Sequence, residues 1–242
     1  MEFNLRLQNM TSSRVADVRM EAAMPLSLDG RAYAWRAESS SQFVMENGNL
    51  VFSVGEFAPY QVKHIKVFFQ GIGPKVERVV ALDSYPLTSH PSPELITLSE
   101  SFAGLSYQEK IQTIYRWMVE NIAFTGIDRQ IEGANAALSS KSGDCTEHML
   151  LAGELLARNG VKVRRVFGVA SPKYRLKVSP AFFHDWLEVF DGKAWMLFDS
   201  AYKTYGMASE INYIGLSFYQ GGSRIIHHAF KMSTASIGVF LN

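Results

Sequence analysis

The sequence predicts an α+β protein in which a small β-sandwich is followed by a domain of mixed helices and strands. Three observations lead to this prediction: alternating apolar residues near the start, a proline-rich stretch after residue 82, and helical spacing from Tyr107 onward. The expected ranges are 1–85 for the sandwich and 86–242 for the second domain. A chain of 242 residues is long enough for two small domains with apolar cores.

Residues 1–82 are predicted to form β-strands. Phe3, Leu5 and Leu7 alternate with polar neighbours, which is typical of a strand with one buried face. Asn47-Gly48 lies between two apolar runs and is a preferred dipeptide of two-residue type I′ hairpins. Other apolar residues that favour strands here are Val15, Val18, Val62, Ile65, Val67, Phe69, Val76, Val79 and Leu82.

Residues 83–100 are predicted to link the two domains, because three prolines lie there among Ser and Thr. The character of the chain then changes. Apolar residues between Tyr107 and Ile122 recur every three or four positions, which predicts an amphipathic helix.

Composition favours an ordinary globular protein, with 47% hydrophobic and 19% charged residues. The net charge of +1 gives no electrostatic case for nucleic acid as a partner. No apolar run approaches the roughly 18 residues of a membrane span. The first residues lack the basic end and apolar stretch of a signal peptide, so a cytoplasmic location is expected unless a signal was trimmed from this chain.

The single cysteine, Cys145, is the candidate nucleophile. A helix is predicted to start at Ser142 as its N-cap and to stop at Asn159-Gly160. Cys145 would lie in the first turn, where a helix lowers the pKa of a thiol and offers backbone N–H groups to an oxyanion. The alternative is a buried cysteine that only packs the helix. Gly143 and Asp144 speak against it, because they suit a close approach of the backbone.

The next segment is predicted to form a β-hairpin. Residues 183–190 and 193–199 have strand character, and Asp191-Gly192 between them is the signal for a two-residue type I′ turn. With a loop of two residues, the register pairs His184 directly with Asp199.

The pairing of His184 with Asp199 has a chemical consequence. Directly opposed Cβ atoms lie about 4.5–5.5 Å apart, within reach of an imidazole–carboxylate hydrogen bond. The carboxylate would fix the tautomer of the imidazole, and the imidazole would deprotonate Cys145. The alternative is a solvated cross-strand pair, worth about 0.2–1 kcal/mol.

Three motifs, in this order, resemble the transglutaminase-like superfamily. Gly143-Asp144-Cys145 opens a helix, His184-Asp185-Trp186 lies in a strand, and Phe198-Asp199 ends the next strand. The resemblance covers about residues 105–205. Residues 1–82 also resemble, more weakly, the β-domain that precedes the core in some bacterial members.

The resemblance implies a papain-like α+β core with a catalytic triad. Cys145 corresponds to the nucleophile, His184 to the base and Asp199 to the orienting carboxylate. Asp185 departs from the family pattern, since members often have Ala there, and Phe124 stands where an aromatic residue with a hydroxyl is common.

The resemblance also implies a thiol enzyme that acts on an amide or acyl group through a thioester. Hydrolysis by a peptidase or amidase is the first expectation, because water needs no second site. Acyl transfer that forms an amide is the second, and a non-catalytic peptide-binding module is the third.

No cofactor and no metal are expected, and the partner is a peptide, amide or acyl substrate. A zinc site made of Cys145, His148 and His184 is a much less favoured reading. Trp117 is expected to pack in the core rather than to hold an oxyanion, as a Trp does in transglutaminases proper. The basic loop with Lys173, Arg175 and Lys177 is expected to be solvated, although it could favour an anionic or carrier-bound acyl donor.

Overall fold

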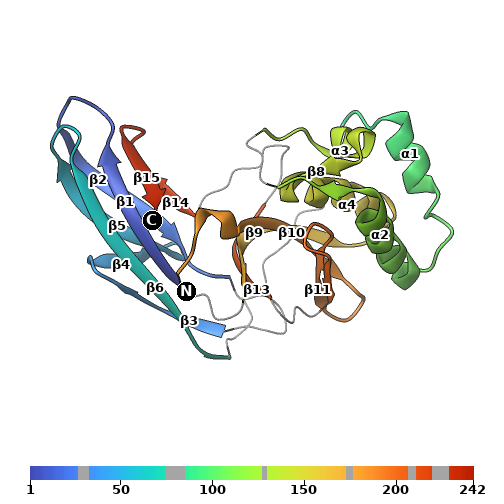
Figure 1. Ribbon diagram of the computed structural model, residues 1–242. Helices are drawn as coiled ribbons and strands as arrows, with labels where there is room; N and C mark the ends of the chain where they lie inside the picture. The colour runs from blue at the N-terminus through green and yellow to red at the C-terminus, as the bar shows by residue number, and fades with distance from the viewer. Residues whose placement is uncertain (27–32, 75–84, 127–129, 173–176, 207–210, 220–228) are drawn as a thin grey trace.

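The computed structural model describes the chain except for residues 27–32, 75–84, 127–129, 173–176, 207–210 and 220–228. Its described parts form a β-sandwich beside an α+β core, as Figure 1 shows. This confirms the fold class that the sequence predicts. Several residues named above lie outside the described residues: Val76, Val79, Leu82, Lys173 and Arg175.

The sandwich consists of two four-stranded sheets. The first has the order β15 (Ile237–Leu241), β1 (Glu2–Asn9), β6 (Val62–Pro74), β3 (Tyr33–Ser39). The second has the order β14 (Phe230–Met232), β2 (Val15–Ala23), β5 (Asn49–Phe57), β4 (Phe43–Glu46). The alternation along β1 buries Phe3, Leu5 and Leu7 between the sheets, as predicted.

Both sheets contain a strand from the C-terminal end of the chain. β15 pairs with β1, and β14 pairs with β2. The predicted ranges 1–85 and 86–242 do not include this return, because a pairing between strands so far apart leaves no local pattern in the sequence. The boundary near residue 85 stays a prediction.

The core sheet has five strands and lies between the helices and the sandwich. Its order is β12 (Thr204–Gly206), β11 (Trp195–Asp199), β10 (Phe183–Phe190), β9 (Val163–Pro172), β13 (Ile211–Phe218). β9 is buried along nearly its whole length, as expected for a strand covered on both faces. A one-turn helix, η1 (Pro180–Phe182), precedes β10.

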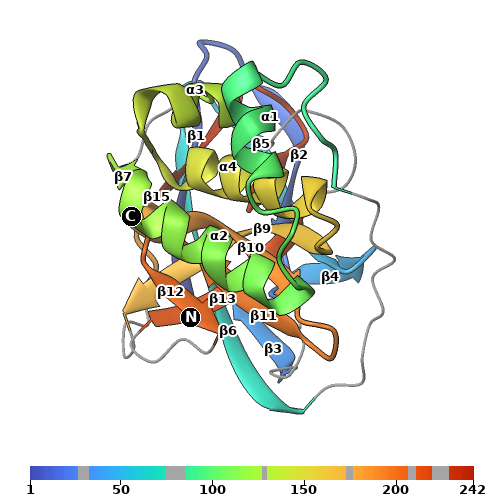
Figure 2. The same ribbon diagram turned by 90° about the vertical axis from the view of Figure 1, so that its right-hand side faces the viewer.

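Helices cover the face of this sheet that points away from the sandwich, as Figure 2 shows. They are α1 (Pro93–Glu100), α2 (Tyr107–Asn121), α3 (Ala134–Ser140) and α4 (Cys145–Arg158). Leu187 and Val189 of β10 belong to the apolar cluster under these helices. Phe167 and Val169 of β9 belong instead to the sandwich cluster around Phe3. The two apolar clusters therefore pack on opposite faces of the core sheet.

The helix α2 starts at Tyr107 as the sequence predicts and ends at Asn121, one residue before the expected Ile122, and it begins with a capping box between Ser106 and Glu109. The predicted linker over residues 83–100 is wrong in its second half, which forms α1. Ser92 caps α1 by accepting a hydrogen bond from Leu95 N, and Pro93 fits the first helical position.

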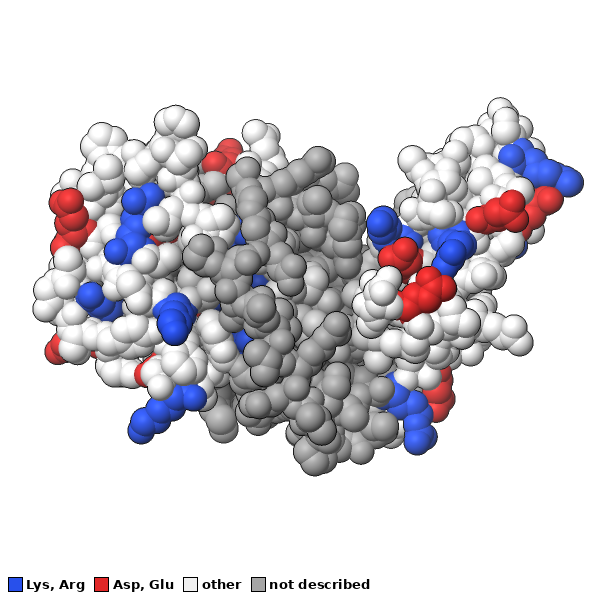
Figure 3. Space-filling model, turned by 180° about the vertical axis from the view of Figure 1, so that it is seen from behind, with Lys and Arg blue, Asp and Glu red and all other residues white. Residues whose placement is uncertain are grey.

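None of the described helices is long and apolar enough to cross a membrane. On the face drawn in Figure 3, acidic and basic side chains are interspersed over the described residues.

Candidate active site

Cys145 is the first residue of α4, as its predicted place in the first turn requires. The N-cap is Asp144 rather than Ser142: Asp144 Oδ1 accepts hydrogen bonds from Thr146 N at 2.7 Å and Glu147 N at 3.3 Å. Ser142 cannot cap the helix because it belongs to β8 (Ser142–Gly143), which pairs in parallel with β7 (Ala123–Phe124).

Gly143 permits the close approach of backbone that the sequence suggests. A Cβ atom at this position would collide with Cβ of Glu147 in the first turn of α4. Any larger residue at position 143 would therefore displace the strand that leads into Cys145.

His184 and Asp199 form a hydrogen bond. His184 Nε2 and Asp199 Oδ2 are 2.7 Å apart, and their side chains are only 1% and 2% exposed. Tyr213 donates to the same oxygen at 2.7 Å, and the backbone N–H groups of Ala201 and Tyr202 donate to Oδ1. Burial raises the pKa of Asp199, but His184 and these donors outweigh it and hold the pKa below its ordinary value.

The hairpin register that led to this pair is nevertheless shifted by two residues. Phe190 pairs with Trp195, not with Lys193, so the loop has four residues. The carboxylate of Asp191 binds the backbone N–H groups of Lys193 and Ala194, both at 2.7 Å, and this closes the longer loop. A shift by an even number keeps each side chain on its face of the sheet. His184 and Asp199 therefore meet diagonally instead of directly.

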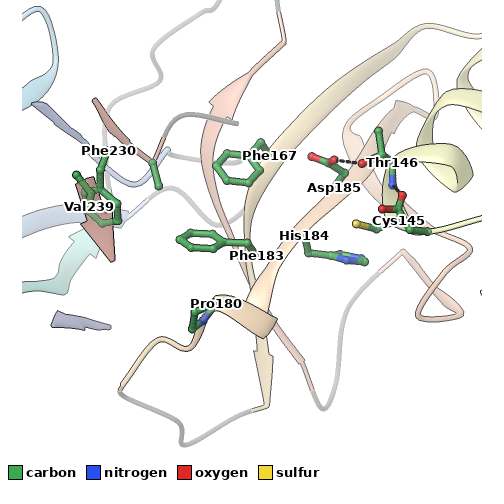
Figure 4. A pocket seen from close by; sticks show the side chains of 11 residues that line it. Cys145, Thr146, Phe167, Pro180, Phe183, His184, Asp185, Phe230 and Val239 are labelled. Carbon is green, nitrogen blue, oxygen red and sulfur yellow. Dashed lines mark hydrogen bonds between the residues drawn. The ribbon is translucent and has the colours of Figure 1, made fainter. Parts of the chain in front are cut away.

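The position of the His184 ring is fixed by its neighbours. Its plane stacks on Tyr202, with ring centroids 4.0 Å apart and planes inclined by 8°. Since Nε2 binds Asp199, Nδ1 is the ring nitrogen that can exchange a proton with a thiol. Figure 4 shows the side chains of Cys145 and His184 next to each other at one end of a cavity.

The Cys145 thiol is not held as a thiolate in this arrangement. Burial raises its pKa well above the ordinary value, and the carboxylate of Asp185 raises it further. The backbone N–H of Asp185 acts in the opposite direction but does not outweigh these effects. The expectation of a lowered thiol pKa is therefore wrong: the helix start does not overcome burial and the neighbouring negative charge.

Asp185 ties the start of α4 to the core sheet. Its Oδ2 accepts a hydrogen bond from Thr146 Oγ1 and its Oδ1 accepts one from Tyr219 OH, both at 2.7 Å. In the sequence, Asp185 stands out only as a departure from the Ala that is common in the family. Its partners were missed because no local pattern relates residues of α4 and β10 to Tyr219.

The other residues that the sequence analysis names do not belong to the hydrogen-bonded pair of His184 and Asp199. Trp117 packs against the helical core, as expected, with Lys141 Nζ 5.6 Å from its ring centroid. Phe124 contacts the ring of His148, with centroids 6.1 Å apart. His148 Nδ1 lies 2.9 Å from Ser200 Oγ. No group of three or more His, Cys, Asp or Glu residues in the described part of the chain could hold a metal ion.

The cavity beside Cys145 has a volume of about 310 Å³. Figure 4 shows the thiol and His184 at one end, with aromatic side chains leading toward the sandwich. The lining residues are Asp144, Cys145, Thr146, Phe167, Pro180, Phe183, His184, Asp185, Ala229, Phe230 and Val239.

Solved structures with a similar fold are distant in sequence. A candidate cysteine protease from Cytophaga hutchinsonii is 13% identical, with a TM-score of 0.49 over 100% of this chain and 90% of its own. The periplasmic domain of TgpA from Pseudomonas aeruginosa is 14% identical, with a TM-score of 0.44 over 83% and 88%. LapG from Legionella pneumophila is 12% identical, with a TM-score of 0.41 over 52% and 70%. At such values these likenesses say nothing about activity.

No curated protein matches the sequence. The family model of the transglutaminase-like superfamily matches residues 97–200, the segment that contains Cys145, His184 and Asp199. Residues 97–200 of this chain therefore match the core of the transglutaminase-like superfamily.

Proposed function

We propose that the protein is a thiol hydrolase, a peptidase or amidase, in which Cys145 is the nucleophile, His184 the base and Asp199 the orienting carboxylate. The observation that carries the proposal is the buried 2.7 Å hydrogen bond between His184 and Asp199, with His184 lining the same cavity as Cys145 at the start of α4.

The first step is attack by Cys145 on the carbonyl carbon of an amide. Because the resting thiol is neutral, His184 Nδ1 takes its proton as the sulfur–carbon bond forms. Asp199 stabilises the imidazolium that results, since its carboxylate already accepts the opposite N–H of the ring.

The second step is collapse of the tetrahedral intermediate. Its oxyanion lies next to the N–H of Cys145 at the start of α4, where the partial positive charge of a helix N-terminus stabilises an anion. The carbon–nitrogen bond breaks, the amine takes the proton from His184, and the acyl group stays on Cys145 as a thioester. Water, deprotonated by His184, then attacks the thioester carbon; the carbon–sulfur bond breaks, the acid leaves, and His184 returns the proton to the sulfur of Cys145.

Burial of the pair argues for catalysis over a purely peptide-binding role. Removing a carboxylate from water costs several kcal/mol, which a protein must offset with hydrogen bonds such as the four that Asp199 accepts. A binding module gains nothing from this arrangement, whereas a thiol enzyme needs an oriented imidazole.

The experiment that tests hydrolysis is product partitioning from a preformed Cys145 acyl-enzyme, with and without millimolar amines. Free acid as the main product at every amine concentration supports a hydrolase. Amide as the main product at low amine concentration contradicts hydrolysis and assigns the protein to the amide-forming acyl transferases. Cys145→Ala, which removes the nucleophile, is the control for spontaneous reaction of the donor.

A further inference from the structure

The cavity beside Cys145 has an apolar wall that the proposed chemistry does not use. Phe167 of β9 and Phe183 of β10 stack in it, with ring centroids 5.6 Å apart and planes inclined by 23°. Pro180 of η1 adds a third apolar surface. In Figure 4 these side chains extend away from the thiol rather than around it. The reacting atoms need no such wall.

The far end of this wall belongs to the sandwich. Phe230 of β14 and Val239 of β15 line the cavity there, and Phe230 packs edge-on against Phe3 of β1, with centroids 5.2 Å apart. Because β14 and β15 are hydrogen-bonded into the two sandwich sheets, this end is anchored in a rigid scaffold. The cavity is thus built jointly by the core and the sandwich.

The end nearest the thiol carries negative charge. Asp144 and Asp185 line it and are 5% and 2% exposed. The described lining residues include no Lys or Arg that could pair with an acidic ligand. Bringing another carboxylate into this space places like charges together in a partly dehydrated site, which is unfavourable.

We infer that the cavity is a side-chain subsite that selects acyl donors with an aromatic or branched apolar side chain beside the scissile carbonyl and excludes acidic ones. As a statement about specificity, this rests on the proposed hydrolase function. The volume of about 310 Å³ suits one large side chain with its flanking backbone, at the lower end of the usual range for ligand pockets.

The sandwich thereby takes part in substrate choice. The cavity does not favour an anionic donor, which a basic loop would attract. Lys177, the described basic residue of that loop, forms an isolated parallel β-bridge with Glu2 through its backbone and does not line the cavity.

Binding to a protein without the nucleophile tests the subsite independently of catalysis. The Cys145→Ala protein is titrated by NMR with the N-acetyl amides of phenylalanine, leucine, glycine and aspartate. We expect the phenylalanine and leucine amides to bind at least about tenfold more tightly than the aspartate amide.

Two substitutions at one lining residue move this preference in opposite directions. Val239→Trp fills the far end of the cavity. It is expected to bring the ratio of the binding affinities for the phenylalanine and glycine amides close to one. Val239→Ala enlarges it and is expected to favour a naphthylalanine amide over the phenylalanine amide. Val44→Trp, on the exposed strand β4, is the matched control and should leave the ratios unchanged. If Val239→Trp does not fold, the preference of the Val239→Ala protein for the naphthylalanine amide still tests whether the cavity binds the side chain.

Equal binding of the phenylalanine and aspartate amides, or ratios that neither Val239 variant changes, would overturn the inference. The wild-type protein is then mixed with activated esters of the same four N-acetyl amino acids. Selective binding without any acyl-enzyme on Cys145 supports the subsite and contradicts the proposed hydrolase. Acyl-enzyme formation with no side-chain preference supports the hydrolase and contradicts the subsite.

Discussion

Two buried aspartates flank the Cys145–His184 site, and they differ in what they bind. Asp199 accepts a ring N–H from His184 together with a tyrosine hydroxyl and two backbone N–H groups. Asp185 accepts the hydroxyls of Thr146 and Tyr219, and its charge bears on the thiol of Cys145. The first carboxylate binds His184, the proposed base, whereas the second adjoins Cys145, the proposed nucleophile.

The difference shows that a carboxylate near a thiol does not by itself favour the thiolate. In the proposed mechanism, Asp199 stabilises positive charge on His184 and so helps it take a proton. Burial raises the pKa of the Cys145 thiol, and Asp185 raises it further by disfavouring negative charge there, while the hydrogen bond of Asp185 with Thr146 ties the first turn of α4 to the core sheet. Three substitutions test this contrast, in order of decreasing expected effect, and a fourth extends it to another buried carboxyl group.

The largest effect is expected for Asp199→Asn. The amide cannot stabilise the imidazolium and favours the wrong tautomer of His184, so kcat for an amide substrate should fall by about 10³–10⁴-fold. Steady-state kinetics measures this, and Glu56→Gln on the exposed surface serves as the control. A variant that keeps more than a tenth of the wild-type kcat would remove Asp199 from the proposed triad.

A smaller loss is expected for Tyr213→Phe. This change deletes one of two donors to Asp199 Oδ2 but keeps His184 and both backbone donors. A hydrogen bond to a charged group is worth about 1.5–3 kcal/mol, so kcat/KM should fall roughly 10- to 150-fold, with the unfolding midpoint measured in parallel. Tyr60→Phe, an exposed tyrosine, is the control. An unchanged kcat/KM would show that the three remaining donors are sufficient.

Asp185→Asn is expected to act on the thiol in the opposite sense. Removing the negative charge lowers the pKa of Cys145, so alkylation by iodoacetamide at pH 7 should become several-fold to about tenfold faster. Thr146→Val removes one hydrogen bond to Asp185 but leaves its charge, and it should not accelerate alkylation. Faster labelling of both variants would point to loosened packing instead of charge.

The smallest effect concerns stability and a third buried carboxyl group. Burial raises the pKa of Glu147 to about 7, and its side-chain hydrogen bond with Asp144 raises it as well. The folded protein therefore holds a proton that the unfolded chain loses near pH 4.5, and this contribution to stability is present below pH 4.5 and lost as the pH rises through about 7.

Glu147→Gln keeps the shape of the side chain but does not titrate. The free energy of unfolding of the wild type, measured by urea denaturation, should fall relative to that of the variant between pH 4.5 and 8, by on the order of 1 kcal/mol. Parallel pH profiles would show that Glu147 is not protonated in the folded protein.

Two Gly-containing turns show how far the sequence could predict the structure. Asn47-Gly48 forms the expected two-residue loop between β4 and β5, with both residues at positive φ (51° and 82°). In Asp191-Gly192 only Gly192 has a positive φ, and the Asp191 side chain binds the next two backbone N–H groups. The dipeptide predicts a hairpin in both places, but this side-chain capture changes the loop length and the register.

The candidate site was predictable where its residues lie on local elements. Cys145 at a helix start and His184 and Asp199 on one hairpin follow from patterns within about 20 residues. The residues that support them do not follow from such local patterns. Tyr213 lies in β13 and Tyr219 directly after it, whereas Phe230 and Val239 lie in strands of the sandwich. Only the tertiary fold brings such distant segments together.

The central claim is that Cys145 accepts an acyl group with the help of His184. The most direct measurement is rapid-quench mass spectrometry of the protein after mixing with activated esters of N-acetyl-phenylalanine and N-acetyl-glycine, followed by peptide mapping. We predict an acyl adduct on Cys145 that forms at least about 100-fold more slowly in His184→Ala, but at the normal rate in His64→Ala, which alters an exposed histidine of β6. An adduct on other residues only, or one that forms equally fast without His184, would contradict the account.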